Sequence, residues 1–112
     1  MKVSDLVKEL DLVVFSGRDG LNREITGGYV SDLLSDVMGN ASEGEVWVTL
    51  QTHRNVVAIA SLKELACILL VGSLTPEQNT IDHSNEEGIP VLGTAMSTFE
   101  IAGLMYQKIK SR

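Results

Sequence analysis

The spacing of apolar residues switches repeatedly along this chain, from the period of a helix to that of a strand and back. Apolar residues of segment 3–10 recur at i, i+3, i+4 and i+7, one face of a helix, with Ser4 as the expected N-cap. Segment 11–15 is a β-type run. Strands that alternate with helices pair in parallel through right-handed crossovers. We therefore predict an α/β fold with three layers, α/β/α, around a mostly parallel central sheet of four to five strands.

The same alternation continues to the C-terminus. It predicts a helix after Gly27–Gly28 that ends at Gly39–Asn40, a strand over 45–50, a helix over 53–65 capped by Thr52, a strand over 66–71, a helix from the Thr75–Gln78 cap to Glu87, a strand over 89–92 and a last helix opened by a Ser97–Glu100 capping box.

Four segments carry more specific signals. Asp19–Gly20, within polar segment 16–23, indicates a turn or hairpin. Segment 66–71 is entirely apolar, which is typical of a strand covered by helices on both faces. The helix that ends at Glu87 has only Ile81 as a large apolar residue, so we expect it to be mostly exposed. Pro90 indicates a sheet edge or the start of a strand.

Length and composition favour one domain over residues 1–112, because no linker-like stretch divides the chain. A domain of 112 residues can bury enough surface to fold without disulfides or a metal, the apolar fraction of 44% excludes a disordered chain, and the single cysteine excludes an intramolecular disulfide. No apolar run approaches the roughly 20 residues of a membrane helix. The N-terminus lacks the pattern of a signal peptide. We expect a cytoplasmic protein that does not bind membranes.

The charge of the chain argues against nucleic acid as a partner. Nine basic residues stand against fifteen acidic ones, giving a net charge of −6. Such a balance leaves no basic stripe to neutralise a phosphate backbone. The acidity is more simply a contribution to solubility.

Two consecutive glycines stand out in the segment from Arg23 to Asp36. Gly27 and Gly28 follow a short β-type run and, on this pattern, directly precede a helix. Glycine at such a turn adopts unusual φ and ψ and lets a ligand or another backbone approach closely. Alternatively, the pair only lets the strand and helix pack closely.

This segment resembles the motif of the DRTGG domain, in its stand-alone form. The matching residues are Arg23, Ile25, Thr26, Gly27, Gly28 and Asp32, followed by Leu34–Val37. The similarity continues through 49–52, 69–72 and 88–92, most of the chain, while Asn22 and Glu24 depart from the pattern and Glu24 breaks the literal five-letter motif.

The resemblance implies a fold similar to the N-terminal domain of HPr kinase/phosphorylase. Such domains also accompany CBS domains, phosphate acetyltransferases and regulatory pyrophosphatases, which implies regulation, ligand sensing or dimerisation. Kinase activity is not implied, because the chain has no Gly-x-x-x-x-Gly-Lys-Ser/Thr loop to hold a triphosphate.

A ligand site is expected beyond the carboxyl ends of the parallel strands. Small and hydroxylic residues there meet helix N-termini, which favour a small anion or a nucleotide. The candidate ligand-binding residues are Arg23, Thr26, Gly27, Gly28, Gln51, Thr52, His53, Arg54, Gly72, Ser73, Thr94 and Ser97. The alternative is that these residues are ordinary caps and turns.

No grouping of residues predicts catalysis, a metal or a cofactor. His53 stands where a general base could lie, but a lone histidine at a helix start is more often solvated. His83 lies in the most polar segment and should be exposed. Cys67 lies in the most apolar strand, where a thiol is inert. The carboxylates do not form an acid/base pair.

Other residues point to the core or to an interface. Arg23 and Asp32 favour a structural ion pair, with Asp32 also capping its helix, although they could mark an interface or a site. Trp47 is either a core residue or an interface anchor. The last helix carries a second apolar group, Phe99, Leu104 and Tyr106. Together with the assembly role of the family, this group predicts an isologous homodimer.

Three functions remain open from the sequence. The first is a non-enzymatic regulatory domain that dimerises and senses a small anionic metabolite or nucleotide. The second is an adaptor without a small-molecule site that docks on a metabolic enzyme or kinase. The third is a minor hydrolase or transferase that uses His53. An open pocket lined by Gln51, Thr52, Ser73 and Thr94 would favour sensing, and a collapsed edge beside an apolar patch would favour docking.

Overall fold

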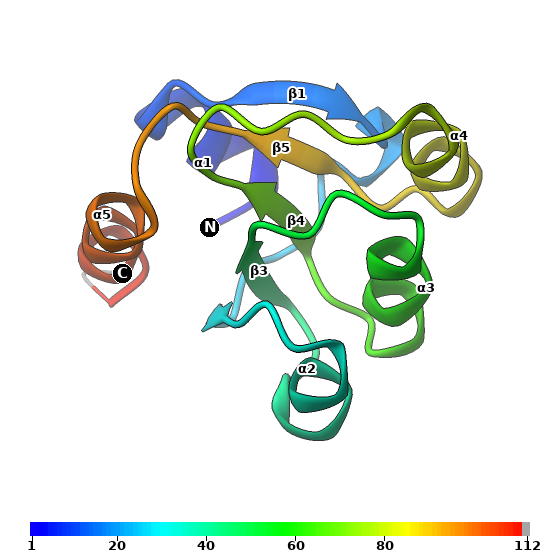
Figure 1. The fold of residues 1–112 in the computed structure, drawn as a ribbon. Coiled ribbons are helices and arrows are strands. Elements are labelled where there is room, and N and C mark those ends of the chain that lie inside the picture. The colour runs from blue at the N-terminus through cyan, green and yellow to red at the C-terminus, as the bar shows by residue number, and fades with distance from the viewer. Residues whose placement is uncertain (111–112) are drawn as a thin grey trace.

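A five-stranded sheet with the order β1-β5-β4-β3-β2 forms the middle of the computed structural model, which describes residues 1–110 (Figure 1). The strands are β1 (Val13–Ser16), β2 (Gly27–Val30), β3 (Glu45–Thr49), β4 (Cys67–Leu70) and β5 (Val91–Gly93). Strands β2 to β5 are parallel, and β1 pairs antiparallel with β5. The prediction of a mostly parallel α/β sheet is confirmed.

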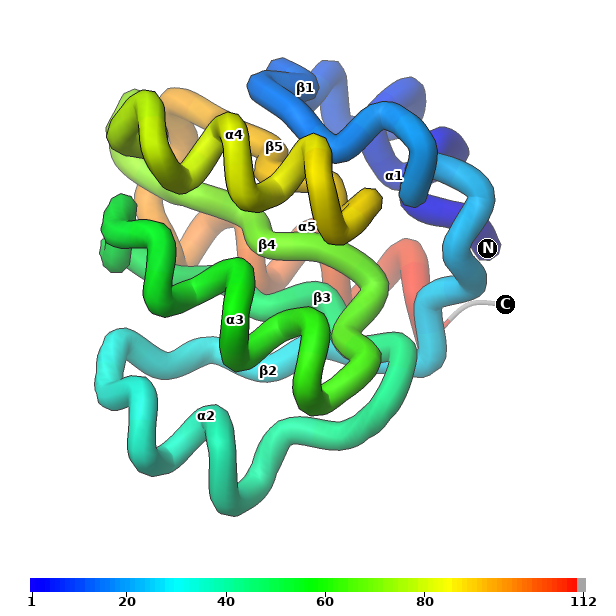
Figure 2. The backbone as a smooth tube through the Cα atoms, turned by 90° about the vertical axis from the view of Figure 1, so that its right-hand side faces the viewer, coloured from blue at the N-terminus to red at the C-terminus, as the bar shows by residue number. Residues whose placement is uncertain are grey.

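Helices cover both faces of this sheet, as the three-layer prediction requires. Helices α1 (Val3–Leu10) and α5 (Thr98–Lys110) lie on one face (Figure 1). The other face carries α2 (Leu34–Asn40), α3 (Asn55–Leu62) and α4 (Gln78–Glu87), which are stacked side by side in Figure 2. No helix among residues 1–110 is long and apolar enough to cross a membrane.

The core is split by the sheet into two apolar clusters. All four residues of β4 are buried, as expected for a strand covered on both faces. On β3 the side chains alternate, so Val46 and Val48 pack with α1 and α5. Trp47 packs with α2 and α3 on the opposite face and is fully buried. Its Nε1–H donates to the carbonyl of Ser31 at 2.8 Å, so Trp47 is a core residue and not an interface anchor.

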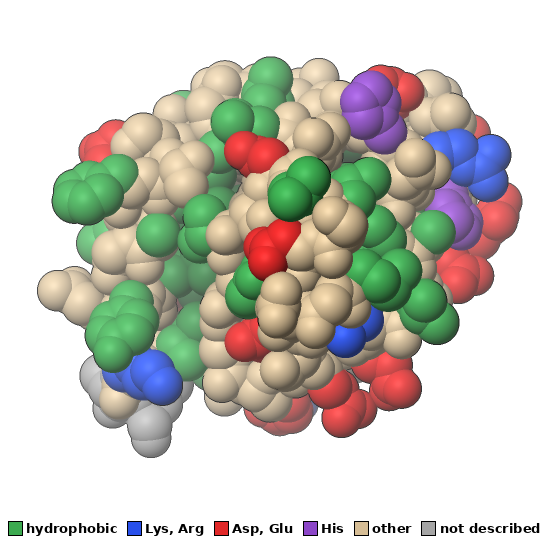
Figure 3. All heavy atoms as spheres, turned by 60° about the horizontal axis from the view of Figure 1, so that its bottom comes forward, with side chains coloured by type: hydrophobic (Ala, Val, Ile, Leu, Met, Phe, Trp, Pro, Cys, Tyr) green, Lys and Arg blue, Asp and Glu red, His purple; other side chains and the backbone are tan. Residues whose placement is uncertain are grey.

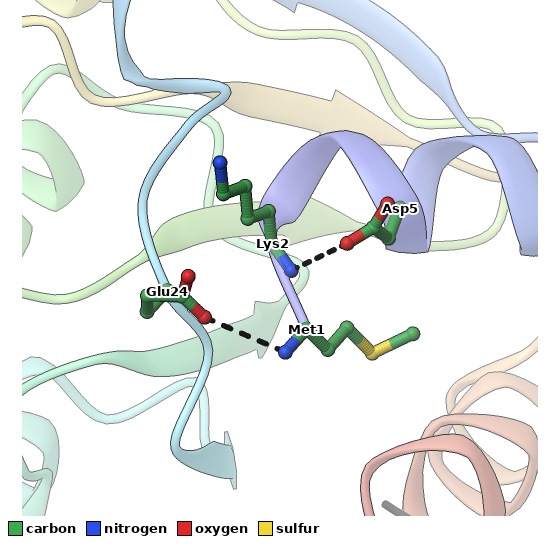
Figure 4. A network of polar contacts seen from close by, with 4 residues as sticks. All are labelled: Met1, Lys2, Asp5 and Glu24. Carbon is green, nitrogen blue, oxygen red and sulfur yellow. Dashed lines mark hydrogen bonds and ion pairs between the residues drawn. The ribbon is translucent and has the colours of Figure 1, made fainter.

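The N-terminal helix begins differently from the prediction. Lys2, not Ser4, is the N-cap of α1, and its backbone N–H donates to the Asp5 carboxylate at 2.8 Å (Figure 4). The Met1 ammonium lies 3.4 Å from the Glu24 carboxylate. Asp5 is the third residue of the helix, and its carboxylate accepts the hydrogen bond from the backbone N–H of the N-cap residue. A sequence rule that looks for a hydroxyl side chain at the N-cap does not anticipate this arrangement.

Other helix starts are partly as predicted. Arg54, not Thr52, is the N-cap of α3, and the Thr52 carbonyl instead accepts a hydrogen bond from the Thr80 hydroxyl at 2.8 Å. Helix α4 starts at Gln78 with Glu77 as its N-cap, so the prediction that Thr75 caps this helix is wrong. The capping box of α5 is confirmed, since the Ser97 hydroxyl accepts from the Glu100 N–H at 3.3 Å and the Glu100 carboxylate accepts from the Ser97 N–H at 3.3 Å.

The expected hairpin after β1 is absent from the described sheet. Strands β1 and β2 lie at its two opposite edges, joined by a short 3₁₀ turn, η1 (Arg18–Gly20), and an extended segment. Pro90 precedes β5, which is an inner strand. Of the two interpretations of this proline, the start of a strand is therefore correct and the sheet edge is wrong.

Helix α4 packs through small polar side chains. Thr80 and Ser84 are fully buried, and the Ser84 hydroxyl donates to the Ile89 carbonyl at 2.5 Å while it accepts from the Ser16 hydroxyl at 2.8 Å. His83, expected to be exposed, is half-buried, and its Nδ1 has no hydrogen-bond partner among the described residues. Buried hydroxyls that are satisfied by hydrogen bonds let a helix with few apolar residues cover the sheet.

Candidate functional site

The glycine pair forms the start of edge strand β2. Gly27 and Gly28 pair with Glu45 and Val46 of β3, and neither has a positive φ. The next helix begins only at Leu34. The expectation of a tight turn directly before a helix is therefore wrong, because the pairing with β3 keeps the chain extended through Val30.

The candidate ligand-binding residues divide between two ends of the sheet. Four of them, Arg23, Thr26, Gly27 and Gly28, lie at or before the amino end of β2. The remaining eight follow the carboxyl ends of β3, β4 and β5: Gln51, Thr52, His53, Arg54, Gly72, Ser73, Thr94 and Ser97. The prediction that all of them share one edge is wrong, because the glycines begin a strand instead of ending one.

The loops that follow the carboxyl ends of β4 and β5 are joined to each other by backbone hydrogen bonds. The N–H of Gly72 donates to the Met96 carbonyl at 2.9 Å, and the N–H of Ser73 donates to the Thr94 carbonyl at 2.9 Å. The N–H of Thr94 donates to the Leu70 carbonyl at 3.0 Å. These three backbone donors are thus engaged within the protein and are not available to an anion.

The side chains at this edge are engaged in the same way. Thr94 is buried, and its hydroxyl accepts from the Met96 N–H at 3.2 Å. Gln51 donates to the Asp32 carbonyl at 3.0 Å. His53 is exposed and lies 3.0 Å from the Glu77 carboxylate, which fits a solvated histidine better than a general base. Of the eight candidates at this end, exposed Arg54 is the residue best placed to meet an anion in solvent.

Arg23 and Asp32 lie at opposite ends of the sheet and do not form the expected ion pair. The Arg23 Nε donates to the Gly88 carbonyl at 3.2 Å. Asp32 accepts from the Thr49 hydroxyl at 2.9 Å and from the Leu50 N–H at 2.7 Å. Leu33, and not Asp32, is the N-cap of α2. Asp32 therefore fixes the end of β3 instead of capping a helix.

Tyr29 and Asp36 form a titratable pair. The Tyr29 hydroxyl donates to the Asp36 carboxylate at 2.9 Å. Hydrogen bonds from Ser31 and then Tyr29 hold the pKa of Asp36 below its ordinary 3.8. The hydrogen bond to Asp36, with some burial, raises the pKa of Tyr29 above its ordinary 10.0. The two side chains hold β2 against α2.

This pair has a testable effect on stability. Folding lowers the pKa of Asp36, so the ionised carboxylate stabilises the folded protein. This stabilisation is fully present at pH values above the pKa of Asp36 in the unfolded chain. It is lost as the pH falls through the pKa of Asp36 in the folded protein. Asp36→Asn should therefore flatten the acid limb of stability and return the Tyr29 pKa toward 10.0. Acid unfolding curves and the absorbance of tyrosinate measure the two effects. An unchanged Tyr29 titration in the variant would contradict the assignment.

Cys67 is buried in β4, and this burial raises its pKa to about 12. The reactive thiolate is thus scarce, and the side chain is inaccessible. We expect a thiol reagent near neutral pH to leave native Cys67 unmodified and to react at once after unfolding. Rapid modification of the native protein would contradict this burial.

Among residues 1–110, no group of three or more His, Cys, Asp and Glu is placed to hold a metal.

A groove of about 400 Å³ lies between edge strand β2 and helix α5. Hydrophobic side chains gather in the hollow beside α5, at the left of Figure 3. Its lining residues are Thr26, Gly27, Gly28, Tyr29, Val30, Glu45, Val48, Ala102, Met105, Tyr106, Ile109 and Lys110. It contains three of the candidate residues, Thr26, Gly27 and Gly28, and none from the carboxyl edge.

The groove has an apolar part and a polar end. Helix α5 starts after the carboxyl end of β5 and returns over the sheet, so Lys110 reaches the amino end of β2, near Thr26 and Glu45. The Lys110 ammonium lies 5.9 Å from the centre of the Tyr106 ring. Sequence reasoning missed the groove, although the second apolar group on the last helix, which includes Tyr106, was a signal for it.

Comparison with known proteins identifies a family and a solved structure of similar fold. Residues 5–108 match the DRTGG domain. The structure is similar to that of the CBS and DRTGG domains of the regulatory region of Clostridium perfringens pyrophosphatase, complexed with the activator diadenosine tetraphosphate. The TM-score is 0.71 at 14% identity, over 95% of this chain and 46% of that chain, so the likeness concerns the fold. No curated protein matches the sequence significantly.

Proposed function

The chain belongs to the DRTGG domain family, and we propose that it is a non-catalytic regulatory module that senses a small anionic metabolite, with a nucleotide as the first candidate. The observation that carries the proposal is the groove between β2 and α5, beside the glycine pair of the motif. Its volume of about 400 Å³ falls within the range of small-molecule sites, and its apolar walls with a few polar groups have the usual character of such sites.

The fold relative supports the choice of ligand class. Its CBS and DRTGG domains lie in the regulatory region of an enzyme, and it was complexed with a nucleotide activator. In this chain Lys110 supplies a positive charge at the polar end of the groove. The site that we propose therefore differs from the carboxyl-edge site expected from the sequence, where the N–H groups of Gly72, Ser73 and Thr94 are engaged within the protein.

The test of this function is a calorimetric titration and thermal-shift panel with adenine, uridine and nicotinamide nucleotides, acyl phosphates and small carboxylates. A ligand at about 100 times its dissociation constant should stabilise the fold by roughly 2.7 kcal/mol, a shift of several degrees. A flat panel in both measurements would overturn the sensing function. It would favour the adaptor, for which the exposed Leu33 and Leu62 on the α2–α3 side offer apolar contacts.

We also propose that the module is an isologous homodimer. On α5, Phe99 is 89% exposed, and Leu104 and Tyr106 are exposed as well. A second copy that covers these side chains would remove apolar surface from water. Light scattering at micromolar concentration should give twice the monomer mass of 12.1 kDa, and Phe99→Ser should reduce it. A wild-type mass of one chain would overturn the dimer without affecting the sensing proposal.

A further inference from the structure

We propose that the groove between β2 and α5 recognises the base of an adenine nucleotide, which lies along the outer edge of β2 with its phosphate beside Lys110. This inference rests on the proposed function, and it adds that the protein recognises the base of the ligand. The fold itself does not explain why Gly27 and Gly28 are both glycine.

Neither glycine is required by backbone conformation or by close packing. Both are extended, and a Cβ added to Gly27 would lie 3.6 Å from the Glu45 carboxylate, an ordinary contact. A Cβ added to Gly28 would point toward α5, 3.4 Å from the terminal carbon of Met105. Glycine inside a strand often marks a place where a ligand approaches the backbone closely. At Gly28 the missing side chain keeps the floor of the groove open.

The outer edge of β2 presents a donor and an acceptor. Ser31 donates its N–H inward, to the Val48 carbonyl at 3.2 Å. Because successive residues of a strand alternate, Gly28 and Val30 turn their backbone groups outward, and no other strand among residues 1–110 pairs with β2 on that side of the sheet. The Gly28 carbonyl and the Val30 N–H then lie side by side, as an acceptor and a donor. Adenine offers the complementary pair, its N6 amino group and its N1 atom.

The walls of the groove suit a planar heterocycle. Ala102, Met105 and Ile109 form its apolar side on α5, and the exposed Tyr106 ring stands at its mouth. Aromatic and thioether groups pack well against a flat ring. At the polar end, the Lys110 ammonium is accompanied by the Glu45 carboxylate. One positive and one negative charge suit a monophosphate better than a polyphosphate, so the base must supply most of the recognition.

The experiment compares two glycine variants in calorimetric titrations with adenosine monophosphate. Gly28→Val fills the floor of the groove, and valine is favourable in a strand, so the fold should persist. Gly103→Ala is the matched control, since a Cβ there meets nothing within 4 Å. We expect at least a tenfold loss of affinity for the first variant and no change for the second. Urea unfolding of each variant verifies that both are folded.

Competition experiments on the wild-type protein test the base independently of any variant. Adenosine should displace adenosine monophosphate, whereas tripolyphosphate and N6,N6-dimethyladenosine, which lacks the N6–H donor, should not. Wild-type affinity in folded Gly28→Val, or full displacement by tripolyphosphate, would overturn base recognition in this groove while leaving nucleotide sensing intact. The absence of saturable binding by any nucleotide would overturn both proposals.

Discussion

Replacement of Gly17 by alanine should destabilise the fold by about 3 kcal/mol or more. Gly17 follows β1 with a φ of +72°, in the left-handed region that a side chain disfavours. An added Cβ would lie 2.2 Å from the Ile89 carbonyl oxygen and 2.7 Å from the Pro90 Cα. These are backbone atoms leading into β5, so the strand itself would have to move. Urea unfolding measures the change.

The matched control is Gly39→Ala in α2. There a Cβ meets nothing within 4 Å, and alanine is the better helix former by about 1 kcal/mol. We expect the control to be as stable as the wild type or slightly more stable. A Gly17→Ala variant with wild-type stability would show that the contact between the end of β1 and the start of β5 is not as close as described.

Replacement of Trp47 by alanine should cost about 3–5 kcal/mol, a large part of the stability of a small domain. The side chain is fully buried between β3 and helices α2 and α3, and its removal leaves a cavity that this packed layer can fill only partly. The change also leaves the Ser31 carbonyl without the indole N–H that lies 2.8 Å away. Chemical unfolding, followed by circular dichroism, measures the loss.

Trp47→Phe separates these two contributions. Phenylalanine keeps an aromatic ring in the core but cannot donate a hydrogen bond to Ser31, so we expect an intermediate loss of about 1–3 kcal/mol. Full stability of Trp47→Ala would contradict the burial of this side chain. Such a result would reopen the interpretation of Trp47 as an exposed anchor for a partner.

The order of the elements could be predicted because its signals are local. The alternation of Val46, Trp47 and Val48 places their side chains on two faces regardless of the rest of the chain. The Ser97–Glu100 capping box acts within one helical turn. Likewise, Gly88 ends α4 with a φ of +65°, as its position after the helical pattern indicated.

Pairings between distant segments could not be predicted. Asp19–Gly20 looks like a hairpin turn, but β1 pairs with β5, whose residues lie 75 to 80 positions further along, and so the turn joins strands at opposite edges. The buried face of α4 cannot be recognised from an apolar pattern, because the buried residues Thr80 and Ser84 stand where apolar side chains would be expected. Their hydrogen-bond partners, Thr52, Ser16 and Ile89, lie outside the helix and give no periodic pattern.

The position of the candidate site depended on the same kind of information. Gly27–Gly28 looks like a turn because the pair lies between a β-type run and a helical pattern. Pairing of these residues with Glu45 and Val46 makes them the start of a strand instead. We therefore propose the groove that β2 forms with α5 as the site, in place of the carboxyl edge around Gly72 and Ser73.

The most direct test of a ligand site beside the glycine pair is an amide NMR titration with adenosine monophosphate. We expect saturable shifts at Gly27, Gly28 and Val30 and along α5 near Tyr106, with Gly72 and Ser73 unchanged. Shifts confined to Arg54, Gly72 and Ser73 would place the ligand at the carboxyl edge and contradict the groove as the sensing site.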